Sequence, residues 1–171
     1  KAGVCSDLLG SLLIEFTEYE QRAAHMVGGS TDDQLRYFFL RYMEWVKDHH
    51  VTHHRMSPWT CARLFFSGRN SYPSLTDRYK CGDCRTMLSW MARQCVAMSD
   101  TAIGVGDHDG KYFVLGERTG VLSTYDALRC TAAWSLASYV EEIAQTGALL
   151  TEMQQQRLSD HGLRFLRSYA R

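Results

Sequence analysis

The chain has 171 residues, enough for one domain with a hydrophobic core, and its 19 basic and 19 acidic residues give a formal net charge of zero. This balance gives no support for binding to nucleic acid or to an anionic membrane surface. No apolar run reaches the length of a membrane-spanning helix. We therefore expect one domain over residues 1–171 that binds neither a nucleic acid nor a membrane.

The helical spacing of apolar residues predicts five helices. They cover residues 5–27, 32–48, 84–98, 133–147 and 152–169. A Gly-Gly pair stops the first helix, and Ser30 or Thr31 is expected to cap the second. The only two prolines, Pro58 and Pro73, lie within residues 57–75, which are therefore predicted to form the longest connection.

A different pattern lies between the third and fourth predicted helices. It predicts three short strands, over residues 101–106, 111–116 and 121–126. Asp109-Gly110 is a strong hairpin signal, and Thr119-Gly120 predicts a second tight turn. A small antiparallel meander flanked by helices predicts an α+β fold.

The first predicted helix carries the best-placed nucleophile. Cys5 lies in its first turn, where free N–H groups and the positive end of the helix dipole stabilise a thiolate. The meander offers His108 as a base and Asp126 as the group that orients it. The alternative is that Cys5 is a small buried apolar residue and that His108 is a solvated turn residue.

The cysteine count also bears on the compartment. Six cysteines in a chain of this length are too few for a disulfide scaffold, and several lie on apolar helical faces. We expect a reducing, intracellular compartment. The chain begins at Lys1 without a methionine, so we expect it to be a processed or excised piece.

The order of motifs over residues 1–147 resembles one viral family. "KAGVC" and an apolar helix precede "YKCGDCRTMLSWMARQ", the predicted meander with "GVLSTYD", and "LASYVEEIAQTG". This order is similar to that of the deubiquitinating protease domain of herpesvirus large tegument proteins, which is papain-like. The resemblance implies a papain-like arrangement, with Cys5 as the family's nucleophile.

Two positions depart from that family's pattern. Val4 stands where the family has the glutamine that helps to form the oxyanion hole. In "YDAL", Asp126 is retained, but Leu128 stands where the family has its basic histidine, and leucine cannot transfer a proton. The resemblance then implies a pseudoenzyme that binds a ubiquitin-pathway or host protein, located in the virion tegument and the host cytoplasm or nucleus. The alternative is an active cysteine protease or deubiquitinase that uses Cys5, His108 and Asp126.

A second resemblance implies no enzyme at all. A glycine, the apolar stretch "VLSTYD" and the helix after it are similar to the carboxyl-terminal part of viral US22-type and SUKH modules. These modules are non-enzymatic and imply a protein-interaction role.

A structural zinc ion is predicted together with this module. His54, Cys61, Cys81 and Cys84 have the spacing His-x6-Cys-x19-Cys-x2-Cys, which suits tetrahedral zinc, and His53 is an alternative to His54. Solvated histidines with free or disulfide-bonded cysteines are the other interpretation. No other cofactor is predicted.

Overall fold

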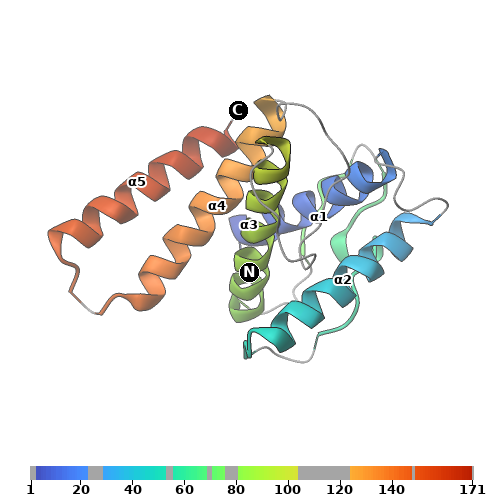
Figure 1. Ribbon diagram of the computed structural model, residues 1–171, viewed down its shortest axis with the longest axis horizontal. Coiled ribbons are helices and arrows are strands. Elements are labelled where there is room, and N and C mark those ends of the chain that lie inside the picture. The colour runs from blue at the N-terminus through green and yellow to red at the C-terminus, as the bar shows by residue number, and fades with distance from the viewer. Residues whose placement is uncertain are drawn as a thin grey trace.

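The computed structural model describes residues 3–22, 29–52, 56–68, 71–75, 81–103, 124–147 and 149–170. These residues form α1 (Val4–Arg22), α2 (Thr31–Asp48), the short 3-10 helix η1 (Ala62–Leu64), α3 (Cys81–Ile103), α4 (Thr124–Gln145) and α5 (Glu152–Tyr169). Helix α3 lies between α2 on one side and the α4–α5 pair on the other, and α1 crosses behind it (Figure 1). The five predicted helices are all present, and the last has the predicted ends, 152–169, whereas the other four differ from the prediction at one end or both.

The predicted α+β fold is wrong, because the described residues form helices and no strand. Residues 101–103, predicted to start the first strand, continue α3. Residues 124–126, predicted to end the third strand, form the first turn of α4. The centre of the predicted meander, 104–123, lies outside the described residues. The papain-like arrangement, a helix packed on a small sheet, is corrected with it.

Local sequence signals explain why helices extend into the predicted strands. Helix α3 ends directly before Gly104, a common residue after a helix. At the other end, Ser123 precedes Asp126 by three residues, which is the spacing of a helix capping box. The alternation of apolar residues in "VLSTYD" favours a strand instead, but its described residues, 124–126, are helical.

An aromatic cluster between α2 and α3 forms the centre of the core. Trp59, from the connection between these helices, is fully buried. Its ring centroid lies 5.4 Å from that of Phe39, 5.5 Å from that of Tyr42 and 5.9 Å from that of Trp90. Aromatic side chains bury large apolar areas, so this one residue ties the connection to both helices.

The predicted long connection is confirmed in its described part, 56–68 and 71–75, which contains only η1. Its last residues run against α1, where the Leu75 N–H donates to the Ser6 carbonyl over 3.1 Å. A Cβ atom at Gly10 would lie 2.6 Å from the backbone of Pro73 and Ser74. Only glycine allows such a close approach of the connection to α1.

A bidentate ion pair holds α4 against α1. The Nε atom of Arg129 donates to Oε2 of Glu15 over 3.1 Å, and its Nη2 atom donates to Oε1. The Tyr125 hydroxyl donates to the same Oε1 over 2.9 Å. Paired N–H···O bonds fix the geometry as well as adding energy, so they set the register of α4 on α1.

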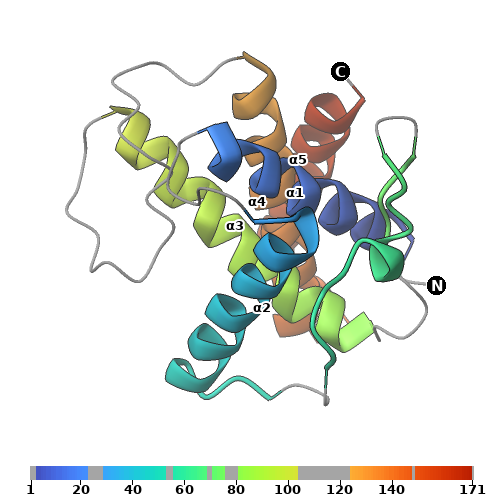
Figure 2. The same ribbon diagram turned by 90° about the vertical axis from the view of Figure 1, so that its right-hand side faces the viewer.

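Helices α4 and α5 form a hairpin that extends away from the other helices, with α5 at its outer edge (Figures 1 and 2). Thr151 caps α5 through a capping box with Gln154. Phe165 and Ser168 are its buried residues, and Gly162 lies against the ring of Tyr139 on α4. Helix α5 therefore packs mainly on α4 and leaves its other faces exposed.

Candidate functional site

The predicted catalytic residues lie in three different settings. Cys5 is in the first turn of α1, as predicted, and is half-buried. Asp126 is the third residue of α4 rather than a strand-end residue, and its side chain lies outside the described part. His108 also lies outside it. The pairing of Cys5 with a base therefore stays a prediction.

The predicted zinc ligands are only partly described. Cys84 is buried in α3, whereas His54 and the Cys81 side chain lie outside the described part. Among the described residues, no three metal-ligating side chains come together. Zinc binding also stays a prediction.

The described thiol of Cys61 is engaged by a carboxylate. The Cys61 N–H donates to Oδ1 of Asp32 over 2.6 Å, which ties the connection to the start of α2. Burial, and after it the hydrogen bond to Asp32, raises the pKa of the Cys61 thiol to about 11.

A pair of buried thiols, which the cysteine spacing did not single out, lies between α3 and α4. A hydrogen bond to Cys130 and then burial raise the pKa of Cys95 well above its usual value. Such thiols are unsuited to nucleophilic chemistry, because the thiolate is the reactive form. The five described cysteines, which include this pair, are not joined in disulfides.

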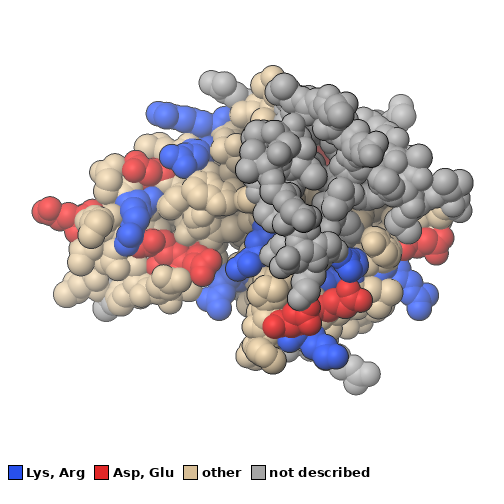
Figure 3. All heavy atoms as spheres, viewed as in Figure 1, with Lys and Arg blue, Asp and Glu red and all other residues tan. Residues whose placement is uncertain are grey.

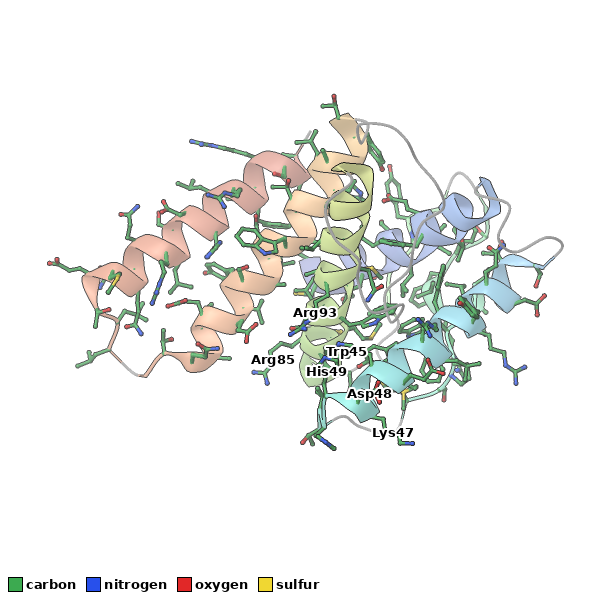
Figure 4. The ribbon with its side chains drawn as sticks, in the orientation of Figure 1. Trp45, Lys47, Asp48, His49, Arg85 and Arg93 are labelled. Atoms are coloured by element: carbon green, nitrogen blue, oxygen red, sulfur yellow. The ribbon has the colours of Figure 1, made fainter. Side chains whose placement is uncertain are left out.

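A cluster of cationic side chains around one tryptophan forms where α3 passes the end of α2 (Figure 4). We call Trp45 of α2, His49 at the C-cap of α2, and Arg85 and Arg93 of α3 the cationic cluster. Lys47 of α2 points away from it in the same view. Both arginines and His49 are exposed, and Trp45 is half-buried.

The end of α2 positions the first half of this cluster. The His49 N–H and the carbonyl of Trp45 are 3.0 Å apart, and Nδ1 of the His49 ring lies 3.0 Å from the same oxygen. The two rings lie 30° from parallel with their centroids 4.9 Å apart.

Helix α3 supplies the two guanidinium groups. The Cζ atom of Arg93 lies 5.7 Å from the centroid of the Trp45 ring, which is a cation–π distance. Arg85 precedes Arg93 by eight residues, a rise of about 12 Å along the helix. The four-residue spacing of Trp45 and His49 at the end of a predicted helix is the sequence signal for the first half of this cluster.

The tryptophan also leaves a donor unmet. Its Nε1 atom is buried and has no hydrogen-bond partner among the residues that the structure describes. A buried donor without an acceptor costs stability. Guanidinium groups bind carboxylates and phosphates in bidentate fashion. The cluster is therefore suited to an anionic group that also contacts an aromatic ring.

The wider surface shows mixed charge. On the face seen in Figure 3, acidic and basic groups are interspersed over the α4–α5 side. A nucleic-acid-binding domain typically presents a continuous basic stripe. The cationic cluster is thus a local feature of a chain with no net charge.

Comparisons with known proteins add no relative. No protein-family model matches the sequence, and no curated protein or solved structure matches it either. Within the described ranges, no helix combines the length and the apolar character needed to cross a membrane.

Proposed function

We propose that this domain acts by binding another protein, and that it holds an acidic segment of that partner on the cationic cluster. The observation that carries the proposal is the position of Arg93 over the Trp45 ring at the end of α2, with the exposed Arg85 about two turns earlier on α3. These two exposed arginines are separated by a rise of about 12 Å along α3, which matches carboxylates about two turns apart on a helix.

An acidic protein segment fits this cluster better than a nucleic acid does. The formal net charge of zero provides no long-range attraction for a polyanion. The half-buried Trp45 ring provides an apolar contact beside Arg93, and a protein segment offers apolar side chains beside its carboxylates. Charge pairs of this kind contribute to specificity and to the association rate.

Of the predictions made from the sequence, only one is part of this proposal, namely that the partner is a protein. The tegument-type role, a ubiquitin-pathway partner and catalysis by Cys5 stay predictions, and no contact among the described residues favours one of them. Binding at the cationic cluster requires no reactive thiol and no metal. A single binding assay, carried out without a reactive thiol or a metal, therefore distinguishes this proposal from the enzyme and zinc alternatives.

Fluorescence anisotropy with a labelled peptide of glutamates around one leucine tests the proposal. We expect saturable binding that weakens as salt rises, because screening reduces exposed ion pairs. Arg85→Glu and Arg93→Glu should each reduce the affinity roughly tenfold or more. Arg36→Glu, an equal charge change at an exposed position near the other end of α2, is the control and should change the affinity little.

The matched peptide, with glutamines in place of glutamates, separates charge from apolar contact. Equal binding of the two peptides would contradict the proposal, and so would an equal loss of affinity in Arg36→Glu and Arg93→Glu. Circular dichroism and thermal melting of each variant verify that the helices remain intact.

A further inference from the structure

Helix α5 presents an apolar stripe on the side that does not face α4. Ser159, Leu163, Leu166 and Ala170 are all exposed, and the two leucines are 48% and 60% exposed. Their spacing of four, three and four residues is that of the a and d positions of a helix–helix seam. We call these four residues the outer stripe. Phe165, on the opposite side of α5, is buried against the hairpin.

Two opposite charges lie beside the outer stripe on one flank. Asp160 and Arg167 are both exposed and are seven residues apart, so they occupy equivalent heptad positions. In an antiparallel pair of identical helices, equivalent flanking positions face each other across the seam. Asp160 of each copy then lies opposite Arg167 of the other, which gives two symmetric ion pairs.

We infer that α5 is the contact between two copies of this chain, paired antiparallel about a twofold axis. Leu163 of one copy packs on Leu166 of the other in two equivalent layers, and Ser159 packs on Ala170 at each end. An isologous contact of this kind uses one patch twice. This inference concerns a different surface from the cationic cluster and goes beyond the proposed function.

The charge pattern argues against a lipid surface at this position. Amphipathic helices that lie on membranes carry mainly lysine and arginine beside the apolar face. Here Asp160 flanks the stripe, and Glu152 begins the helix. A parallel pair of α5 helices would place Asp160 opposite Gln155 rather than a cation, so only the antiparallel arrangement pairs Asp160 with Arg167.

The contact is small, so the pairing is weak. The outer stripe covers three turns of helix, about 16 Å, and its area falls below the standard interface of ~800 Å² per partner. We expect a concentration-dependent equilibrium between monomer and dimer at roughly 10–500 µM protein.

Sedimentation equilibrium of the full chain tests the inference. The mass of the wild-type chain should rise from 19.6 kDa toward twice that value with concentration. Leu166→Glu should remain monomeric over the same range. Ile143→Glu is the matched control, because Ile143 is 48% exposed and lies on α4 rather than on α5, and it should dimerise like the wild type.

Charge exchange tests the antiparallel geometry. Asp160→Arg gives a flank with two arginines, and Arg167→Asp gives a flank with two aspartates, so each variant alone should lose dimerisation. An equimolar mixture of the two should recover a 1:1 dimer, because every facing pair is then opposite in charge.

Three results would overturn the inference. They are a wild-type mass that stays at 19.6 kDa, a Leu166→Glu mass that rises as the wild type does, and a mixture of charge variants that stays monomeric. Co-sedimentation of a monomeric wild type with vesicles containing phosphatidylserine, lost in Leu166→Glu, would assign the outer stripe to a lipid surface and would also overturn it. All variants lie at exposed positions, and circular dichroism verifies their helix content.

Discussion

The body of the molecule and the α4–α5 hairpin bury different kinds of side chain. In the body, which comprises α1, α2, α3 and the connection between α2 and α3, the fully buried residues include Trp59, Tyr42 and Phe38. In the hairpin, the fully buried residues are small, namely Ala132, Ala133 and Ser135. The hairpin also exposes large apolar side chains, among them Leu163 and Leu166.

Because of this difference, the body and the hairpin are expected to contribute unequally to the free energy of unfolding. Large buried aromatics contribute most to the free energy of unfolding, whereas small buried residues allow close helix contact at a smaller gain. We therefore expect the body to determine global stability. The outer part of the hairpin is expected to open at lower free energy, as regions with few buried contacts do.

Replacement of Trp59 by alanine is the strongest test of this comparison. It removes a fully buried indole from the aromatic cluster, and it should lower the free energy of unfolding by about 3–5 kcal/mol. Urea denaturation followed by circular dichroism measures the loss. Trp134→Ala in α4, where the side chain is 38% exposed, should cost much less. Equal losses in the two variants would contradict the comparison.

Phe165→Ala sharpens the comparison within the hairpin. Phe165 is 7% exposed and is the largest buried side chain of α5, so we expect a loss of about 3 kcal/mol. Hydrogen exchange should show faster exchange of amides in residues 152–169, with protection in α2 and α3 retained. Uniformly faster exchange across all helices would mean that the hairpin and the body unfold as one unit.

Gly10→Ala tests the packing of the connection on α1. The new Cβ atom would lie 2.6 Å from the backbone of Pro73 and Ser74, so the connection must shift. We expect a loss of roughly 1–3 kcal/mol in the free energy of unfolding. Gly82→Ala in α3 is the matched control, because a Cβ atom there meets nothing within 4 Å, and it should be neutral or slightly stabilising.

The start of α2 should give the smallest effect, and it depends on pH. Hydrogen bonds from the Ser30 side chain and backbone lower the pKa of Asp33 below its usual 3.8. The unfolded chain therefore takes up this proton first as pH falls. The stabilisation is present above about pH 4 and is lost as pH falls through the lowered pKa. Thermal melting from pH 6 to pH 2 should show a slightly smaller loss in Asp33→Asn than in the wild type.

The helices could be predicted from sequence because their apolar spacing is local. The cap of α2 illustrates this, since Ser30, one of two predicted candidates, forms the capping box with Asp33. The predicted strand over residues 121–126 is wrong at its described end, 124–126, because its local pattern is ambiguous. A short alternating run fits a strand and a helix start equally well, and the packing of Arg129 and Tyr125 on Glu15 cannot be read from spacing.

The candidate site was less accessible to sequence reasoning than the helices. Trp45 and His49 are four residues apart, so their contact follows from helical geometry once α2 is assigned. Arg93 lies 48 residues after Trp45 in the sequence, and its position over the ring depends on how α3 packs against α2. The cysteines and histidines were candidates because of their residue types, although only tertiary contacts decide which of them lie close together.

The indole N–H signals in a nitrogen-15 NMR spectrum provide the most direct test of the proposed function. The protein has four tryptophans, and Trp45→Phe identifies the signal of Trp45. Titration with the glutamate–leucine peptide should shift the Trp45 signal in a saturable way and leave the Trp134 signal on the hairpin unchanged. A Trp45 signal that does not move, or one that moves equally with that of Trp134, would contradict binding at the cationic cluster.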